Sequence, residues 1–240
     1  TVAVTTYKRE PNMVLRSVMS LCKQSYNNLE IIVVDDSPSS YKMRHKVKES
    51  IESLNDSRWT YVQHLSNNGA CAARNTAIKM GTGKYFMYLD DDDELLYRCV
   101  ERRLDGFTDY GVGLVYGKYY ICKNNDYRKL IIPRQMMIDG WVFSELIKKN
   151  FICAFPMVRY ECFERCGLFD TKMQSAQDYE MWLRITQKYK VKHTREPLVI
   201  VHLHDGERIT TATKKKIQGT NRIIEIYYDY YKLHSPAYRN

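Results

Sequence analysis

The chain has 240 residues, a length that suits one large domain or two small ones. Hydrophobic residues make up 44% of it and charged residues 27%, which is typical of a globular chain and excludes a disordered or fibrous one. No apolar run approaches the roughly 20 residues of a membrane-spanning helix, so we do not expect an integral membrane protein.

The formal net charge of +9 is unevenly divided along the chain. Residues 1–120 contain 16 Lys and Arg against 15 Asp and Glu, whereas residues 121–240 contain 21 against 13. A basic second half suits nucleic acid, an anionic membrane surface or a phosphorylated small molecule as a partner. Charge alone does not choose among these three.

The chain begins at Thr1 without an initiator Met, so we expect it to be part of a longer protein. Its seven cysteines are irregularly spaced and form no CxxC pair: Cys22, Cys71, Cys99, Cys122, Cys153, Cys162 and Cys166. An odd, scattered set predicts reduced thiols in a reducing compartment, the cytoplasm.

The first third alternates between strand and helix patterns. The predicted strands are short apolar or β-branched runs: Val2–Thr5, Glu30–Val34, Trp59–Val62 and Tyr85–Leu89. The predicted helices have apolar residues at helical spacing: Pro11 through Cys22, residues 41–54, and Gly69 to Met80. Strands separated by helices predict an α/β fold with a mostly parallel central sheet flanked by helices.

The second half is more mixed. We expect strands at Gly113–Ile121, Pro156–Arg159 and Leu198–Leu203, and helices at Trp141–Lys149, Gln177–Gln187 and Lys214–Leu233. Because no repeat, low-complexity tract or linker interrupts the chain, we expect one continuous domain that ends in a C-terminal helical extension.

Two acidic clusters follow predicted strands, Asp35-Asp36 after one and Asp90–Asp93 after another. The carboxyl ends of parallel strands meet at one edge of a sheet, where ligands bind in folds of this class. Packed carboxylates repel one another unless a cation neutralises them, and Mg²⁺ and Mn²⁺ take carboxylate oxygens and often bridge to phosphates. The clusters therefore predict a metal–phosphate site, although a solvated acidic loop is the ordinary alternative.

Five motifs occur in order along the chain: Thr5-Thr6-Tyr7, Ile32–Ser37, Asn68-Gly69 with Ala73-Arg74-Asn75, Leu89–Asp93, and Gln177–Glu180. Together they resemble the family 2 glycosyltransferases, which have the GT-A fold. The resemblance implies a single Rossmann-like GT-A domain over residues 1–211, with a nucleotide-sugar-binding half at 1–93 and an acceptor and catalytic half at 94–211. Residues 212–240 would form the helical extension packed on it.

The resemblance also implies roles for individual residues. Thr5 and Asp36 match positions that contact the nucleoside of the donor, and Asp35 would share that work. Asp90 and Asp92 match the ends of the DXD motif, which binds the metal and the donor's sugar and diphosphate. Asp91, between them, would also contact the donor, and Asp93 lies beside the motif. His204 resembles a late histidine that some members use near the metal. Asp178 matches the catalytic base, although the usual Glu-Asp pair is here Gln177-Asp178.

Helix geometry supports Asp178 independently. On a helix, Asp178 shares a face with Met181, Trp182 and Ile185, the face turned to the protein body. Glu180 points about 200° away, because successive residues differ by about 100°, and we expect it to be solvated. A helix-start carboxylate stabilised by the helix dipole is the ordinary alternative for Asp178.

These observations predict a metal-dependent, inverting glycosyltransferase. It would move a sugar from a nucleotide-diphosphate sugar, preferentially a UDP-sugar, to a hydroxyl of a glycan or lipid-linked acceptor in surface polysaccharide synthesis. The cofactor would be Mn²⁺ or Mg²⁺. The basic second half allows a peripheral contact with an anionic membrane, and no nucleic acid is expected.

Two alternatives stay open. A nucleotidyltransferase also needs acids at strand ends and a metal, but it usually has a Gly-rich basic loop, and the segment from Thr5 to Pro11 contains no glycine. A basic nucleic-acid-binding module would explain the charge of the second half, but two Asp clusters would repel phosphates.

Overall fold

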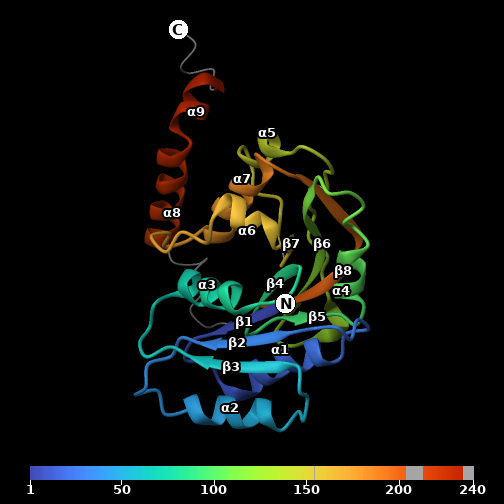
Figure 1. Ribbon diagram of the computed structural model, residues 1–240, viewed down its shortest axis with the longest axis vertical. Helices are drawn as coiled ribbons and strands as arrows, with labels where there is room; N and C mark the ends of the chain where they lie inside the picture. Colours follow the sequence, from blue (N-terminus) through green and yellow to red (C-terminus); the bar gives the residue numbers. More distant parts are fainter. Residues whose placement is uncertain (154, 204–212, 235–240) are drawn as a thin grey trace.

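The computed structural model describes residues 1–153, 155–203 and 213–234 (Figure 1). Eight strands are β1 (Val2–Thr6), β2 (Ile31–Asp35), β3 (Trp59–Gln63), β4 (Tyr85–Asp90), β5 (Glu94–Leu95), β6 (Val112–Lys123), β7 (Met157–Arg159) and β8 (Lys190–Leu203). The α-helices are α1 (Pro11–Cys22), α2 (Arg44–Glu52), α3 (Ala70–Met80), α4 (Cys99–Leu104), α5 (Phe143–Leu146), α6 (Glu161–Cys166), α7 (Gln177–Thr186), α8 (Thr213–Ile226) and α9 (Tyr228–His234). A 3₁₀ turn covers Tyr127–Lys129.

The strands form a single sheet in the order β3-β2-β1-β4-β7-β6-β8-β5. The pairs β1–β2, β2–β3, β1–β4 and β6–β8 are parallel, whereas β4–β7, β6–β7 and β5–β8 are antiparallel. The predicted single α/β domain with a mostly parallel sheet flanked by helices is therefore confirmed.

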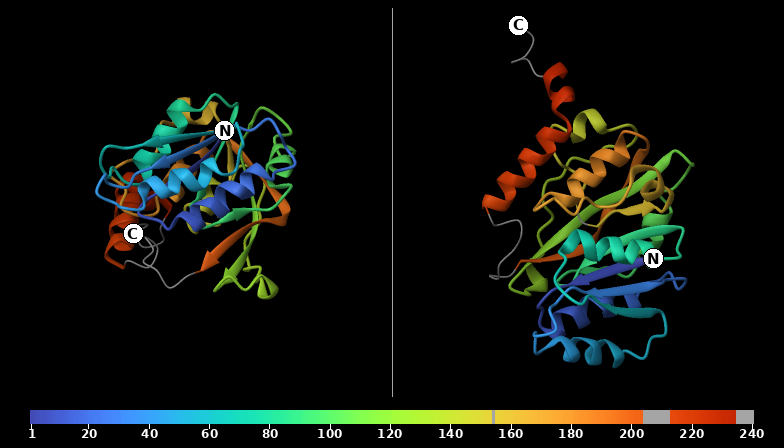
Figure 2. Two further views of the ribbon diagram at one scale, coloured as in Figure 1. Left: turned by 90° about the horizontal axis from the view of Figure 1, so that it is seen from below. Right: turned by 60° about the vertical axis from the view of Figure 1, so that its left-hand side comes forward.

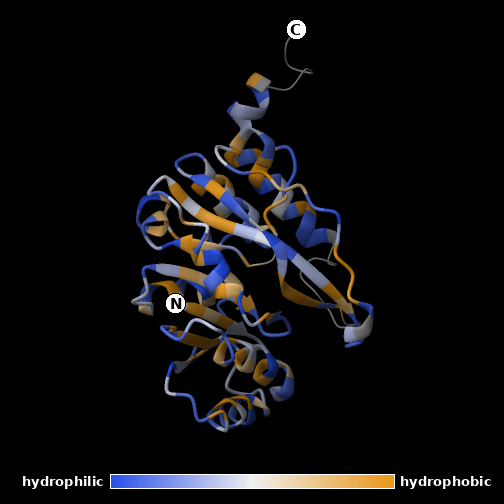
Figure 3. Ribbon diagram, turned by 90° about the vertical axis from the view of Figure 1, so that its right-hand side faces the viewer, coloured by the Kyte–Doolittle hydropathy of each residue, from blue (hydrophilic) through white to orange (hydrophobic). Residues whose placement is uncertain are grey.

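The first four strands are connected by helices that cover both faces of the sheet. Right-handed crossovers put α1 and α2 on one face, where they pack against each other, and α3 on the opposite face against β1 and β2 (Figure 2). Every residue of β2 is buried, as expected for a central parallel strand covered on both sides. Hydrophobic segments accordingly run through the strands, while many loops at the surface are hydrophilic (Figure 3).

Most predicted elements form close to their expected ends, but three differ. The helix expected at Trp141–Lys149 is limited to Phe143–Leu146. Its start is delayed because Gly140 pairs with Val191 in an isolated bridge, and a turn follows the helix. The strand expected at Leu198–Leu203 begins earlier, at Lys190, because the preceding polar residues pair along β6. The long C-terminal helix divides into α8 and α9.

The two C-terminal helices form the predicted extension, and α9 rises away from the sheet (Figure 1). The Ser175 hydroxyl donates a hydrogen bond to the Lys215 carbonyl oxygen, 2.9 Å away, at the start of α8. Gly219 packs so closely on Ser175 that a Cβ at this position would lie 2.5 Å from the Ser175 carbonyl oxygen. In the described part of the chain, no helix is long and apolar enough to cross a membrane.

Candidate active site

The carboxyl ends of β1, β2 and β4 meet at one edge of the sheet. Thr5 of β1 lies opposite Asp90 of β4 and Val34 of β2, and Thr6 lies opposite Asp35. The register therefore brings Thr5 to the same edge as both acidic clusters, as the alternation of strands and helices predicts.

Both carboxylates of the first cluster are engaged by protein groups. Asp35 accepts hydrogen bonds from the Tyr61 hydroxyl at 2.6 Å and from the Ser37 backbone N–H at 2.8 Å. Asp36 accepts hydrogen bonds from the backbone N–H groups of Asn68 and Gly69, at 2.9 and 2.7 Å. Asp36 thereby holds the loop that leads into α3, and Gly69 adopts the φ of +86° that this loop requires.

Asp90 begins the second cluster and is its most accessible member. Water reaches 45% of its side chain, and its Oδ1 lies 3.3 Å from Nη2 of Arg74 on α3. Desolvation by the surrounding protein raises the pKa of the Asp90 carboxyl. The negative charges of Asp92 and Asp178 raise this pKa further, whereas Arg74 lowers it.

Asp91 and Asp92 share an arginine from the loop after β1. The Arg9 Nε atom lies 2.9 Å from Asp91 Oδ1, and its Nη2 lies 3.4 Å from Asp92 Oδ2. Burial raises the pKa of the Asp91 carboxyl to about 7, and the charges of Asp92 and Asp90 add to this, against the opposing effect of Arg9. The cluster therefore combines an accessible carboxylate with a buried one.

Asp93, the last aspartate of the cluster, has a structural role. Asp93 Oδ1 accepts a hydrogen bond of 2.8 Å from the backbone N–H of His202, which ties the end of β4 to β8. His202 is itself buried, with Nε2 2.7 Å from Glu94 Oε1. His204, the histidine predicted near the metal, lies outside the described residues.

Asp178 lies in the first turn of α7, half-buried, and accepts a hydrogen bond from the backbone N–H of Tyr179 at 2.8 Å. Met181 and Trp182 on the same helix are fully buried, so the predicted inward face of α7 is confirmed. Ala176, directly before the helix, has φ +55° and ψ +29°, a left-handed conformation that costs a non-glycine residue about 1 kcal/mol or more. Local strain thus accompanies the start of the helix that carries Asp178.

Helix α3 links the two sides of the site. The buried Arg74 interacts electrostatically with both Asp90 and Asp178, and its guanidinium lies 4.0 Å from the ring centroid of Tyr88. Its neighbour Asn75 exchanges two hydrogen bonds of 2.9 Å with the backbone of Phe169, on the segment that leads to α7. Consecutive side chains of α3 therefore contact both the sheet edge and the approach to α7.

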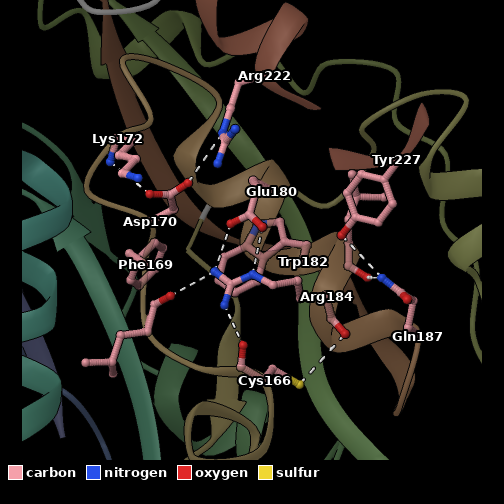
Figure 4. Close-up of polar contacts among 12 residues, drawn as sticks. Cys166, Phe169, Asp170, Lys172, Glu180, Trp182, Arg184, Gln187, Arg222 and Tyr227 are labelled. Carbon is pink, nitrogen blue, oxygen red and sulfur yellow. Dashed lines mark hydrogen bonds and ion pairs between the residues drawn. The ribbon is translucent and has the colours of Figure 1, made fainter. Parts of the chain in front are cut away.

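The expectation that Glu180 is solvated was wrong. Glu180 is buried and forms two hydrogen bonds with Arg184, at 2.7 and 2.8 Å, while Arg184 also donates to the carbonyl oxygens of Cys166 and Leu168 (Figure 4). The segment that ends α6 covers this side of α7, so both sides of the helix are buried. Helix periodicity alone cannot detect a second buried side when charged residues pair with each other there.

A pocket of about 170 Å³ lies between the start of α3 and the start of α7. Asn68, Gly69 and Cys71 line one side, Gln174 and Gln177 line another, and Lys215 of α8 completes it. The loop that Asp36 holds therefore forms one wall of this pocket, and Gln177, the residue before Asp178 in the sequence, lines another.

The carboxylates can supply part of a metal site. Among the residues that the structure describes, no group of three or more His, Cys, Asp or Glu side chains is placed to hold a metal ion. Asp90 and Asp92 provide two carboxylates, which suits Mg²⁺ or Mn²⁺ because these ions commonly complete their coordination with water and substrate phosphates. The donor set therefore fits a metal that binds together with a diphosphate.

Two residues of this site were not predicted from the sequence. Arg9 pairs with both Asp91 and Asp92, and its only signal was a basic residue in the loop after the first strand. Arg74 lies in one of the motifs that carry the family resemblance, but the resemblance gave it no role of its own. Neither contact can be predicted without knowing where α3 and the loop after β1 lie relative to β4.

Solved structures of similar fold include Staphylococcus aureus TarS in complex with UDP-GlcNAc, with 18% identity and a TM-score of 0.72 over 94% of this chain. A second is the mannosyltransferase PcManGT from Pyrobaculum calidifontis in complex with GDP-Man and Mn²⁺, with 19% identity and a TM-score of 0.71 over 95% of this chain. The chain spans 66% and 63% of the lengths of these two proteins. At these identities the likeness establishes the GT-A fold.

Sequence comparison goes further than fold. WcaA of Escherichia coli K12, whose name gives it as a colanic acid biosynthesis glycosyl transferase, is 30% identical over 97% of this chain and 80% of its own length. WfgD of Escherichia coli, named as a UDP-Glc:alpha-D-GlcNAc-diphosphoundecaprenol beta-1,3-glucosyltransferase, is 31% identical over 70% of this chain and 62% of its own length. The family model "Glycosyl transferase family 2" matches residues 1–167. The chain therefore belongs to glycosyl transferase family 2 and is a glycosyltransferase.

Proposed function

We propose that the enzyme moves a sugar from a nucleotide-diphosphate sugar, with a UDP-sugar favoured, to a hydroxyl group of a glycan or lipid-linked acceptor in polysaccharide synthesis. The name of WfgD, which specifies a UDP-sugar donor and a diphosphate-lipid acceptor, supports this choice of substrates. The UDP-GlcNAc in TarS and the GDP-Man and Mn²⁺ in PcManGT support a nucleotide sugar bound with a divalent metal.

The observation that carries the proposal is the coupling of Asp90, Arg74 and Asp178. One buried arginine interacts with the first carboxylate of the acidic cluster on β4 and with the carboxylate on α7. A donor diphosphate beside Asp90 and an acceptor hydroxyl beside Asp178 would therefore both lie near one cation. Proximity of this kind is what a direct displacement between two substrates requires.

In the proposed reaction, Asp178 accepts the proton of the acceptor hydroxyl as the oxygen attacks the anomeric carbon, which inverts the configuration in one displacement. Asp90 and Asp92 would hold the divalent metal, and Asp91 would support the donor beside them. A bound metal supplies positive charge that stabilises the departing nucleoside diphosphate. Thr5, Asp35 and Asp36 would contact the nucleoside.

Replacing Asp178 by Asn tests the assignment of the base. We expect Asp178→Asn to lower kcat by about 10²–10⁴-fold, the usual contribution of a general base, without loss of UDP binding. Asp105→Asn is a matched control, because Asp105 is an exposed carboxylate in an i,i+3 pair with Arg102. Near-normal transfer by a folded Asp178→Asn protein would contradict the proposed mechanism.

The donor and metal are tested by binding. UDP, GDP, dTDP and CMP, each with and without Mn²⁺, are compared by the shift they produce in melting temperature. We expect UDP to give the largest shift, only with Mn²⁺, and Asp90→Asn to abolish the metal dependence. Equal shifts with and without Mn²⁺ in the wild type would contradict a metal held by Asp90 and Asp92.

We also propose that the enzyme works in the cytoplasm, against the inner face of the membrane, where lipid-linked acceptors would be available. All seven cysteines lie within the described residues and are free thiols, which supports a reducing compartment. The excess of positive charge in residues 121–240 supports a peripheral contact with anionic lipid.

A further inference from the structure

A groove of about 240 Å³ lies between α8 and the segment that follows α5, and the start of α7 also lines it. Its apolar wall consists of Ile147, Ile223, Ile224 and Tyr231. Ile147 and Ile223 are buried and form the floor, whereas Ile224 is 44% exposed at the rim.

The rim continues as an apolar stripe along the C-terminal helices. Ile217 and Ile224 are exposed, and their spacing of seven residues places them on one side of α8. Tyr228, the first residue of α9, is also exposed. A hydrocarbon chain that leaves the groove past Ile224 would therefore meet further apolar side chains, interspersed with the exposed polar residues Thr220 and Asn221.

The groove also has polar and cationic lining residues. Lys148 and Lys149 line it with exposed side chains, next to Asn150. The Asn150 Oδ1 atom is buried and has no hydrogen-bond partner in residues 1–153, 155–203 and 213–234. No Asp or Glu of the described chain lines the groove, so its charge is complementary to an anion.

Two residues of the groove are sequence neighbours of the proposed base. Ala176 and Tyr179, which flank Asp178 within two residues, both line it. The Tyr179 hydroxyl donates hydrogen bonds to the carbonyl oxygens of Leu146 and Ile147, at 2.8 and 3.1 Å, and the Tyr231 hydroxyl donates to the latter at 3.2 Å. These bonds join α7, α9 and the segment after α5 into one rigid wall.

We propose that this groove binds the lipid-diphosphate end of the acceptor, with the diphosphate at Lys148 and Lys149 and the first hydrocarbon units along Ile223, Ile224 and Tyr231. This inference rests on the proposed function, since it names the acceptor class for that reaction. Binding to a flat anionic bilayer would require the lysines and the exposed apolar side chains. It would not require a concave apolar wall formed in part by α7, the helix that carries Asp178.

The test measures binding of farnesyl diphosphate to the full chain by calorimetry, in EDTA to prevent binding through a metal. Farnesol and inorganic pyrophosphate serve as probes that lack one half of the ligand. We expect each of them to bind at least tenfold more weakly than farnesyl diphosphate. A second titration contains Mn²⁺ in place of EDTA, so that UDP can bind at the donor site. Saturating UDP should leave farnesyl diphosphate binding in place, and complete displacement by UDP would overturn the proposal because the lipid would then occupy the donor site.

Surface variants locate the site. We expect Lys148→Glu combined with Lys149→Glu, and separately Ile224→Asp, to weaken farnesyl diphosphate binding at least tenfold. The matched controls are Lys42→Glu combined with Lys46→Glu, near α2 at the far end of the molecule (Figure 1), and Leu65→Asp at a residue that is 95% exposed. All these side chains are exposed, so the variants should fold.

Equal losses in the controls, or unchanged binding in the groove variants, would overturn the proposal. Vesicle binding gives a second test. If anionic vesicles without a diphosphate lipid retain the protein as strongly as vesicles with farnesyl diphosphate, and through the same residues, the proposal is also overturned. Because the assay measures binding and not transfer, a negative result for the groove does not affect the test of Asp178 as the base. Likewise, normal transfer by Asp178→Asn would not affect the measurement of farnesyl diphosphate binding.

Discussion

The buried ion pair of α7 allows a quantitative test of what holds this helix in place. Glu180→Gln removes the negative charge and retains the shape of the side chain. In the wild type the Glu180 side chain is only 3% exposed, and the Arg184 side chain is 23% exposed. Arg184 would keep the carbonyl oxygens of Cys166 and Leu168 as hydrogen-bond acceptors, at 2.5 and 2.8 Å (Figure 4).

The expected loss of unfolding free energy follows from this geometry. Removing one partner of a fully buried pair costs about 3–5 kcal/mol, because the other charge is left without compensation. Water reaches part of Arg184, and Gln retains one oxygen acceptor, so we expect about 2–3 kcal/mol for Glu180→Gln.

The chain offers a matched control in Glu161→Gln. Glu161 and Arg165 have the same i,i+4 spacing and the same Nε–Oε1 distance of 2.7 Å, but their side chains are 38% and 65% exposed. An exposed helical pair contributes only about 0.3–0.5 kcal/mol. Urea denaturation of both variants at pH 7, with unchanged m-values, measures the difference. Equal losses, or a loss below about 1 kcal/mol for Glu180→Gln, would refute the argument that burial sets the strength of this pair.

Three further predictions concern stability. Gly219→Ala should destabilise the docking of α8, although Ala favours a helix by about 1 kcal/mol over Gly, because its Cβ would collide with the Ser175 carbonyl oxygen. Faster hydrogen exchange in α8 would support this, and a more stable protein would contradict it. Hydrogen bonds from Arg58 hold the pKa of Asp56 well below its ordinary value, so the stabilisation is complete above the unfolded-state pKa of about 3.9 and declines as pH falls below it. Asp56→Asn should therefore be less stable than the wild type at pH 7, with a gap that narrows below about pH 4 in urea titrations; a constant gap would count against the pair. Arg103 is fully buried with Nε and Nη2 unpaired in the described part of the chain, so Arg103→Met should raise the unfolding free energy by about 1–3 kcal/mol, and a loss would show that the guanidinium is compensated.

Local patterns were sufficient to predict the first half of the fold. β1, β2 and β4 form within one residue of the predicted runs, and Pro11 begins α1 as expected of proline in a first turn. Acidic residues directly after two of these strands indicated the site edge, because parallel strands align their carboxyl ends. Only neighbouring residues are needed to recognise these features.

Elements with short or mixed patterns were predicted less well. β5 and α4 were not predicted at all, since two and six residues are too short to establish a period. β8 was predicted only where it is apolar, although its polar beginning pairs along β6. In these cases the partner strand or surface supplies the stabilisation that the local sequence lacks.

The sequence by itself determined which residues reach the edge of the sheet, because strand and helix periods depend on residues a few positions apart. Tertiary structure decided what each charged group does there. Arg9 reaches Asp91 across 82 positions of sequence, and Asn75 holds Phe169 across 94. Whether a carboxylate is accessible, like Asp90, or buried and paired, like Glu180, depends on such distant contacts, and these exist only once the chain has folded.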